Sequence, residues 1–387
     1  MYDFLIVGAG LYGATFARLA RDAGFTCMVI DKRKHVAGNA HTVQHDDYFI
    51  HKYGPHIFHT DDHDIWAFVN RFAPFNRFTN QPVANWGGVI YNLPFNMNTF
   101  REMFGVTTPE EAIERIKLEI EIAGISKITN LEEQAISMVG TTIYGRLIKN
   151  YTEKQWGRPC SELPPEIIKR LPLRFTYDNA YFDDRYQGIP VYGYTKMVEN
   201  MLDGIDVALR VDFFNDRFNC EKAAKTLVYS GPIDQFFDYR YGKLEYRSLR
   251  FEEVVHKNAD NVQGVAVMNY TSMDKPYTRS VEHKHFTGSA ASGSVVTYEY
   301  SRPASTTDEP FYPVNSRRNN EMYDMYRFDA SKLKNVVIGG RLGTYRYLDM
   351  DDVIKLAADD FVKASRSLKD RGNLLKNGMQ NSWFCTT

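Results

Sequence analysis

The chain has 387 residues, of which 43% are hydrophobic, so it can form a large core and more than one structural unit. Its 47 basic and 48 acidic residues give a formal net charge of -1, which predicts neither a nucleic-acid-binding nor a membrane-binding surface. No apolar run approaches the roughly 20 residues of a membrane span, and no signal peptide precedes the first predicted strand, so we expect a cytoplasmic protein. The cysteines form no CxxC pair and support neither a disulfide framework nor a zinc site; they are Cys27, Cys160, Cys220 and Cys385.

The first 31 residues predict a β-α-β unit. Phe4–Val7 is a short apolar run, and Cys27–Ile30 is a second one. Between them lie small and apolar residues typical of a helix, with Gly24 where the residue after a helix end is expected.

Further along, residues 109–150 predict a helical block, which begins with Pro109 at the first helical position and has a break at Gly124. Residues 239–302 alternate and favour β-branched and aromatic residues, as strands of a sheet do. Residues 335–347 again predict a strand that runs into a glycine turn, and 351–368 a last helix. A glycine-turn unit at each end predicts a nucleotide-binding domain built from discontinuous segments.

A GxGxxG motif lies between the first predicted strand and helix. Gly8 permits a tight turn, Gly10 lets a pyrophosphate approach the backbone, and Gly13 lets the helix and strand pack closely. Asp31 ends the second strand, where its carboxylate can bind a ribose 2′-OH. The motif predicts a dinucleotide site without separating NAD from FAD. Its place at the start of the chain and the stretch "KRKHVAGNAHT" after Asp31 favour FAD.

Several segments combine arginine with aromatic residues. "NYTEKQWGRP" holds a tryptophan that could cap the core or stack on a base, and "LPPEIIKRLPLRF" holds Arg170 and Arg174 between prolines, where they could be solvated or bind phosphate. "PYTRSVEH" and "GGRLGTYRYLDMDD" add Arg279 and Arg341. Arginine binds phosphate oxygens in a fork and tyrosine adds neutral donors, so these segments together predict a site for a phosphorylated ligand.

Other chemistries have no matching motif. The sequence contains no GxSxG, no HExxH and no signature of an activated cysteine. The histidines of "KYGPHIFHT", His56 and His59, have no obvious third metal ligand and follow a Gly-Pro turn, so we predict no metal site. They could instead line a pocket or transfer protons.

Taken together, these segments resemble the prokaryotic UDP-galactopyranose mutases, which are FAD proteins. The similar stretches cover nearly the whole chain in order, and they are "DFLIVGAGLYGATFA", "YGPHIFHT", "NYTEKQWGRP", "IKRLPLRF", "DNAYFDDRYQGIPVYGYTKM", "MNYT", "PYTR", "EHKHF" and "GGRLGTYRYLDMD". The resemblance implies an α/β fold with a Rossmann-like FAD-binding domain, an inserted helical bundle and an antiparallel β-sheet domain. The expected boundaries are 1–72, 203–238 and 332–372 for the FAD domain, 98–176 for the helical domain with a mobile substrate loop near 164–174, and 73–97, 177–202 and 239–331 for the sheet domain.

The resemblance also implies an activity. UDP-galactopyranose and UDP-galactofuranose are interconverted without net redox change, although the FAD must be reduced. Flavin N5 is the nucleophile on the anomeric carbon and UDP is the leaving group. The implied partners are a cellular reductant, NAD(P)H or a reductase, and a second copy of the chain in a homodimer; the product would supply galactofuranose for cell-surface polysaccharide. The alternatives are an amine-oxidase-type flavin oxidoreductase, a UDP-N-acetylgalactopyranose mutase and a non-catalytic nucleotide-sugar binder.

The roles implied for single residues follow the matching motifs. Arg170 closes onto the pyrophosphate, Arg279 is a fixed phosphate arginine, and His59 completes the expected catalytic set. The expected substrate-binding residues are these two arginines with Tyr151, Trp156, Tyr181, Asn269, Tyr312 and Tyr347. The expected cofactor-binding residues are Gly8, Gly10, Leu11, Gly13, Asp31, Lys32, Asn39, His56, Arg341, Asp349 and Met350. Both histidines are expected to be walls that hold and tune the flavin, rather than a proton-transfer dyad.

Overall fold

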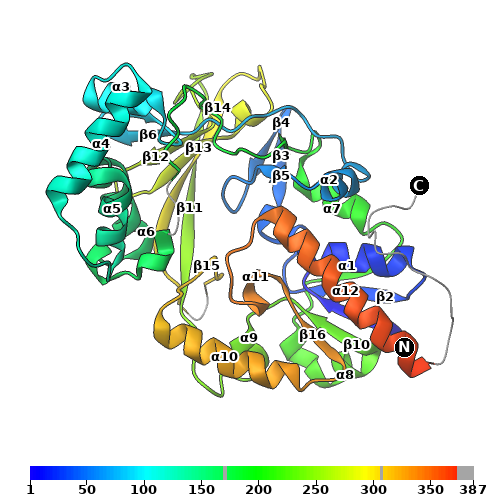
Figure 1. Cartoon of the computed structure of the whole chain (residues 1–387). Coiled ribbons are helices and arrows are strands. Elements are labelled where there is room, and N and C mark those ends of the chain that lie inside the picture. Colours follow the sequence, from blue (N-terminus) through cyan, green and yellow to red (C-terminus); the bar gives the residue numbers. More distant parts are fainter. Residues whose placement is uncertain (169–171, 306–307, 373–387) are drawn as a thin grey trace.

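The structure is a computed structural model that describes residues 1–168, 172–305 and 308–372. Two sheets organise it: a parallel sheet flanked by helices, and a second, larger sheet that carries a group of helices on the opposite side of the molecule (Figure 1). The expected α/β class with a Rossmann-like parallel sheet is confirmed.

The parallel sheet has the strand order β16-β10-β1-β2-β9. Its strands are β1 (Tyr2–Val7), β2 (Cys27–Asp31), β9 (Asp206–Leu209), β10 (Ala224–Tyr229) and β16 (Val336–Ile338). Every neighbouring pair is parallel, so the carboxyl ends of β1, β2 and β10 meet at one edge. Segments far apart in the sequence therefore build one sheet.

The predicted β-α-β unit is present. Helix α1 (Leu11–Asp22) joins β1 to β2. Gly24 has φ +82°, and its N–H donates to Arg21 O while Phe25 N–H donates to Ala20 O. This pair of bonds is a Schellman motif, which satisfies the last carbonyls of α1 and explains the glycine.

The second sheet has the order β15-β11-β14-β13-β12-β6-β7 and is antiparallel except where β12 and β6 pair. Its strands are β6 (Val83–Trp86), β7 (Val89–Asn92), β11 (Tyr246–His256), β12 (Val267–Tyr270), β13 (Arg279–Glu282), β14 (Ser294–Pro303) and β15 (Tyr312–Pro313). Two small sheets pair β3 (Thr42–His45) with β4 (Tyr48–His51) and β5 (Phe58–Thr60) with β8 (Tyr186–Gly188).

The predicted helical block is interrupted. It comprises α4 (Pro109–Ala123), α5 (Leu131–Ile143), the π-helical turn η2 (Tyr144–Ile148) and α6 (Lys149–Trp156). A capping box formed by Thr108 and Glu111 starts α4, and Gly124 in the left-handed conformation ends it. Gly140 has φ +79° and kinks α5, a break that the helical pattern did not predict.

The remaining helices connect these parts. They are α2 (His63–Asn70), α3 (Met97–Phe104), α7 (Gly193–Met201), α8 (Arg217–Ala223), α9 (Ile233–Phe236), α10 (Arg317–Ser331), α11 (Gly340–Gly343) and α12 (Met350–Gly372). Short turns are η1 (Gly38–Ala40), η3 (Cys160–Glu162), η4 (Pro165–Ile168), η5 (Phe213–Asp216) and η6 (His283–Phe286).

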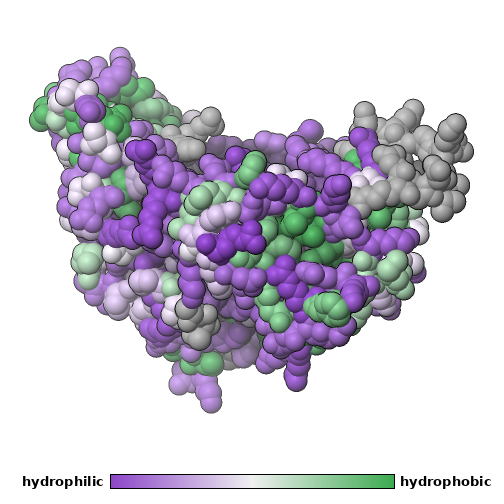
Figure 2. Space-filling model, turned by 90° about the horizontal axis from the view of Figure 1, so that it is seen from below, coloured by the Kyte–Doolittle hydropathy of each residue, from purple (hydrophilic) through white to green (hydrophobic). Residues whose placement is uncertain are grey.

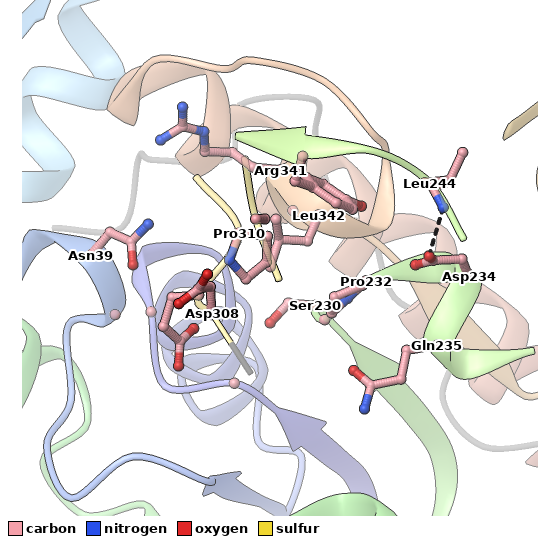
Figure 3. Close-up of a pocket in the computed structure, with 18 of the residues that line it drawn as sticks. Asn39, Ser230, Pro232, Asp234, Gln235, Leu244, Asp308, Pro310, Arg341 and Leu342 are labelled. Atoms are coloured by element: carbon pink, nitrogen blue, oxygen red, sulfur yellow. Dashed lines mark hydrogen bonds between the residues drawn. The ribbon is translucent and has the colours of Figure 1, made fainter. Parts of the chain in front are cut away.

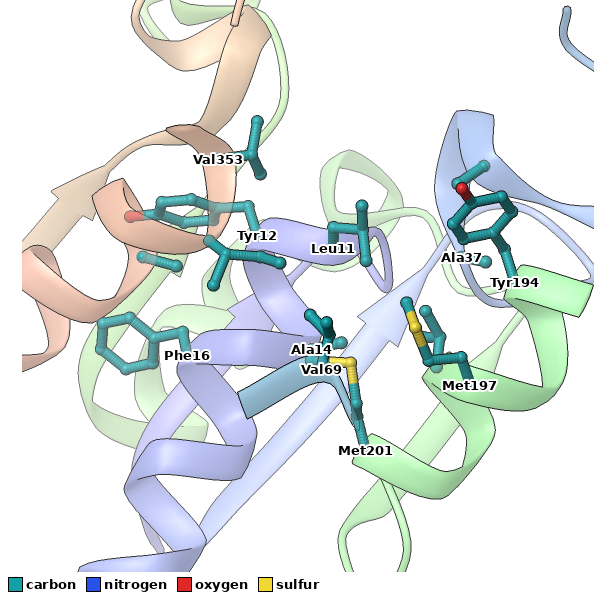
Figure 4. Packing of buried hydrophobic residues seen from close by; sticks show 14 of the residues in the cluster. Leu11, Tyr12, Ala14, Phe16, Ala37, Val69, Tyr194, Met197, Met201 and Val353 are labelled. Carbon is teal, nitrogen blue, oxygen red and sulfur yellow. The ribbon is translucent and has the colours of Figure 1, made fainter. Parts of the chain in front are cut away.

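The largest core lies around α1. Leu11 and Phe16 of α1 are buried with Met197 and Met201 of α7 and Val353 of α12 (Figure 4). Helix α10 likewise buries side chains in the core on the other side of the parallel sheet. Both α7 and α10 thus pack with the parallel sheet although they fall in ranges expected for the sheet domain; the domain boundaries stay a prediction.

The outer surface is largely polar. On the face seen from below, hydrophilic residues surround small groups of hydrophobic ones (Figure 2). Within residues 1–168, 172–305 and 308–372, none of the helices combines the length and the apolar character needed to cross a bilayer.

Candidate functional site

A cavity of about 780 Å³ lies at the carboxyl edge of the parallel sheet. The turn after β1, the end of β2, the end of β10 and α11 all contribute to its walls, and Figure 3 shows Asn39, Ser230 and Arg341 around it. Most of the expected cofactor residues line it, namely Gly8, Gly10, Leu11, Asp31, Lys32, Asn39, His56, Arg341 and Met350. This is the edge at which α/β sheets bind ligands.

Two glycines of the motif, Gly8 and Gly13, have no room for a side chain. Gly8 has φ +112°, and a Cβ on it would lie 2.1 Å from Ser230 Oγ. A Cβ on Gly13 would lie 1.9 Å from the carbonyl oxygen of Gly8, so helix α1 approaches β1 as the motif requires. No side chain caps α1 at Gly10, which leaves the first N–H groups of this 12-residue helix for an anion.

Asp31 fixes the turn as well as facing the cavity. Its Oδ2 accepts a hydrogen bond of 2.7 Å from the N–H of Ala9, and its Oδ1 accepts one of 2.8 Å from Arg33 N–H. Arg33 and Lys32 form ion pairs with Glu309 at 2.9 and 3.4 Å, so a carboxylate from a distant segment meets two cations beside the turn. Sequence reasoning missed Glu309 because only the fold brings it there.

Arg341 supports the prediction of an anionic or hydrogen-bonding ligand. Its Nε and one terminal nitrogen, Nη2, are buried without a hydrogen-bond partner, although guanidinium donors are normally paired. Its guanidinium carbon lies 4.3 Å from the centre of the Tyr347 ring. Together with the glycine turn and the uncapped helix, these free donors fit a bound dinucleotide.

A second polar group is centred on Arg279 of β13, which pairs with Glu299. Its Nε and Nη2 each lie 2.7 Å from Glu299 Oε2, and the Glu299 side chain is 1% exposed. Burial lowers the pKa of Arg279, but Glu299, Tyr151 and Tyr312 raise it more, so the pKa is raised and the guanidinium stays charged. A Cβ on Gly54 would lie 3.1 Å from Glu299 Oε1, so this turn passes directly over the ion pair.

Three expected substrate tyrosines converge on this arginine, and a fourth packs against one of them. Burial raises the pKa of Tyr151, Tyr181 and Tyr312, while the charge of Arg279 lowers the pKa of all three. Tyr347 stacks on Tyr312 with ring centres 5.8 Å apart. Tyr347 is 58% exposed and Tyr181 is 43% exposed, so a ligand can reach both residues. We call Arg279 with these four residues the arginine–tyrosine cluster.

The cavity and the arginine–tyrosine cluster adjoin. Arg341 lines the cavity and covers Tyr347 of the cluster. Trp156, the last residue of α6 before the left-handed Gly157, also lines the cavity. Asn269 of β12 is the strand partner of Arg279. The expected base-binding and phosphate-binding residues therefore share one region.

The two histidines of "KYGPHIFHT" lie in this region in different surroundings. His56 lines the cavity, and its Nδ1 donates to Gly54 O at 2.8 Å. Burial, helped by the charges of Arg341 and Arg279, lowers the pKa of His56 to about 4. A neutral His56 presents its Nε2 as an acceptor.

His59 belongs to β5 and faces the loop before β8. Its ring stacks on Phe182 with centres 3.7 Å apart, and its Nδ1 lies 3.0 Å from Asp184 Oδ2. Burial raises the pKa of Asp349, although the nearby His59 and Arg341 oppose this shift. His59 and Asp349 thus lie close to the cavity although neither is part of its lining, and the same holds for Gly13 inside α1.

Acid is expected to destabilise the protein. Burial lowers the pKa of His56 and His41 to about 4 and that of His283 to about 3. Between these values and about 6.5 the unfolded chain binds protons that the folded chain does not, so stability falls as the pH falls. Each pKa unit corresponds to about 1.4 kcal/mol. We expect the thermal midpoint to fall by several degrees from pH 7 to pH 5 in a melting experiment; an unchanged or higher midpoint would contradict this.

Arg170 lies outside the described residues. Arg174, four residues further along the chain, donates to Tyr181 O at 3.1 Å and pairs with Asp183 at 2.7 Å, so it holds the loop of Tyr181.

Sequence reasoning missed Glu299, although a glutamate within the strand pattern "SVVTYEYSRP" at the position opposite Arg279 could have indicated it.

Two family models and several curated relatives match this chain. A family model described as UDP-galactopyranose mutase matches residues 146–347, and one described as NAD(P)-binding Rossmann-like domain matches residues 6–72. The chain is 40% identical to a probable UDP-galactopyranose mutase of Klebsiella pneumoniae, over 94% of this chain and 95% of the relative. It is 39% identical to a dTDP-fucopyranose mutase of Escherichia coli, over 93% and 97% of the two chains.

Solved structures show the same fold at low identity. A reduced UDP-galactopyranose mutase matches with a TM-score of 0.70 at 13% identity, covering 97% of both chains. A putrescine oxidase matches with a TM-score of 0.56 at 10% identity, covering 95% of this chain and 99% of that one. The family model and the curated relatives show that this chain is an enzyme of the isomerase class and belongs to the UDP-galactopyranose mutase family.

Proposed function

We propose that the protein interconverts UDP-galactopyranose and UDP-galactofuranose with FAD as its cofactor, and that the FAD must be reduced. The observation that carries this proposal is the arginine–tyrosine cluster beside the dinucleotide cavity. Charged and neutral donors grouped in this way suit a pyrophosphate. A nucleotide sugar bound there would have its anomeric carbon near the cofactor, because Arg341 lines the cavity and covers Tyr347 of the cluster.

The chain's own residues would do the following. The Gly8–Gly13 turn and the start of α1 would hold the FAD pyrophosphate, and Asp31 the adenosine ribose. The reduced flavin would supply the nucleophile for the anomeric carbon, so the chain itself need not provide one. Arg279 and the tyrosines would stabilise the charge on the departing UDP, and His56 and His59 would be walls beside the flavin.

The names of the two most similar relatives described above point to two different substrates. One is named for UDP-galactopyranose and another, almost equally similar, for dTDP-fucopyranose. They differ in the nucleobase methyl group, in the 2′-hydroxyl group and in the sugar. An oxidase of the putrescine type is disfavoured, because a cationic amine would be repelled by Arg279 and Arg341.

The substrate is tested with chemically reduced, FAD-loaded protein. We expect it to convert UDP-galactofuranose to UDP-galactopyranose with a higher kcat/KM than it shows for UDP-N-acetylgalactofuranose or dTDP-fucofuranose, measured by chromatography. A higher kcat/KM for dTDP-fucofuranose would overturn the choice of substrate. Flavin reduction by an amine, with peroxide release, would overturn the reaction class.

The remaining expectations from the resemblance stay proposals of the same kind. They are a homodimer, a cellular reductant such as NAD(P)H or a reductase, a cytoplasmic location, the three domain ranges and the closing role of Arg170. For Arg170→Ala we expect bound FAD but a large loss of turnover, because a charge-assisted contact in a closed site contributes about 2–4 kcal/mol. Near-normal turnover would remove Arg170 from the catalytic set.

A further inference from the structure

The ammonium group of Lys154 on α6 lies inside a loop of the antiparallel sheet. Its Nζ donates to the carbonyl oxygens of Tyr270, Ser272, Lys275 and Tyr277 at 2.8, 2.9, 3.1 and 3.0 Å. Burial lowers the pKa of Lys154 to about 8, so the ammonium form with three N–H donors predominates at pH 7. Four carbonyls converge on one cation, and Lys154 has no donor left for a ligand.

The loop that Lys154 holds joins the two strands with expected substrate residues. It follows Asn269 at the end of β12 and precedes Arg279 at the start of β13, and these two residues are strand partners. Helix α6 itself carries Tyr151 and Trp156 on either side of Lys154. One side chain therefore connects the helix and the hairpin that form opposite parts of the site.

The same end of α6 is attached to the sheet at a second point. The carbonyl oxygen of Gln155 accepts hydrogen bonds from Arg247 Nε at 2.8 Å and from Ser301 Oγ at 2.6 Å. These bonds fix α6 against β11 and β14. Lys154 adds a direct attachment of α6 to the β12–β13 loop itself.

We propose that Lys154 is a positioning residue that sets the spacing between Tyr151 and Trp156 on α6 and Asn269 and Arg279 on the β12–β13 hairpin, and thereby the fit of the nucleoside diphosphate. This inference rests on the proposed nucleotide-sugar site. The role requires a compact tetrahedral cation, because a planar guanidinium cannot direct its donors at four converging oxygens.

The test compares Lys154→Met with Lys149→Met, a charge removal on the first residue of the same helix. UDP binding is measured by titration calorimetry, FAD content by absorbance, and turnover with the reduced enzyme. For Lys154→Met we expect the Kd for UDP and the KM for the nucleotide sugar to rise about tenfold, with kcat within about threefold of wild type and full FAD content. For Lys149→Met we expect wild-type values. We expect Lys154→Arg to behave as Lys154→Met does.

The outcomes separate the explanations. An unchanged Kd for UDP in Lys154→Met would overturn the proposal. Wild-type UDP binding by the Lys154→Arg variant would also overturn it, because the charge of residue 154 and not its geometry would then be decisive. A parallel loss of FAD and UDP binding would show a general structural role instead. If the wild-type protein bound no UDP, the proposed function itself would fail. If the wild-type protein and the Lys154→Met variant bound UDP equally well, only the role of Lys154 would be refuted.

Discussion

Replacing Arg279 with methionine is expected to lower kcat/KM by about 100- to 1,000-fold, as the loss of a preorganised charged donor does in other active sites. The arginine is the charge on which Tyr151, Tyr181 and Tyr312 converge. Its removal would take away one of the positive charges that we propose for stabilising the departing UDP. Steady-state kinetics of the reduced enzyme measures the effect.

The same substitution would also leave a buried carboxylate without its ion-pair partner. Glu299 is 1% exposed and its ion pair with Arg279 would be lost, which costs about 3–5 kcal/mol when one partner of a buried pair is removed. The double variant Arg279→Met with Glu299→Gln removes that charge. We expect it to recover thermal stability without recovering activity, which separates folding from catalysis.

A matched control is Arg250 on β11, the strand that pairs with β14, which carries Glu299. Arg250 pairs with Glu252 on an exposed surface, and its strand neighbour Phe251 is the residue aligned with Glu299. Adjacent strand residues point to opposite faces, so Arg250 faces away from Glu299 and the site. We expect Arg250→Met to keep wild-type kinetics. Activity of Arg279→Met equal to that of this control would remove Arg279 from the catalytic set.

The second large effect is expected from the glycine turn, where two alanine substitutions should fail differently. In Gly13→Ala the new Cβ would lie 1.9 Å from the carbonyl oxygen of Gly8, so the strand and helix must separate. We expect loss of both cofactor and stability, since overpacking of this kind costs about 1–3 kcal/mol or more. In Gly10→Ala the Cβ would lie 3.7 Å from the Cα of Gly38, an ordinary contact.

Gly10→Ala is therefore expected to fold like wild type but to hold FAD at least about tenfold more weakly, because the methyl group occupies the path of the pyrophosphate. FAD release is followed by flavin fluorescence, and folding by the melting midpoint of the apoprotein. Gly145→Ala is the control, since a Cβ there meets nothing within 4 Å. Wild-type FAD affinity in Gly10→Ala would show that the pyrophosphate does not approach this glycine.

The sequence predicted local elements well where one pattern determines them. The β-α-β unit, the helix from Pro109 to Gly124 and the final helix are present because each has its own periodicity and end signals. Trp156 ends α6, because the following Gly157 stops the helix in the left-handed conformation. The indole is left in the lining of the cavity.

Long-range partners could not be predicted from such patterns. Glu299 meets Arg279 through the register of β13 and β14, and Glu309 of the cavity lining forms ion pairs with Lys32 and Arg33. The kink at Gly140 depends on Glu119 of α4, whose carboxylate accepts from Thr142 N–H at 2.8 Å. In each case the residue type was visible in the sequence, but the neighbour that explains it was supplied by the fold.

The most direct test of the central claim is turnover of UDP-galactofuranose by the same FAD-loaded preparation before and after reduction with dithionite. The account predicts formation of UDP-galactopyranose by the reduced protein at many turnovers per flavin, and little or none by the oxidised protein. Fully reduced, FAD-loaded protein that leaves UDP-galactofuranose unchanged would contradict it.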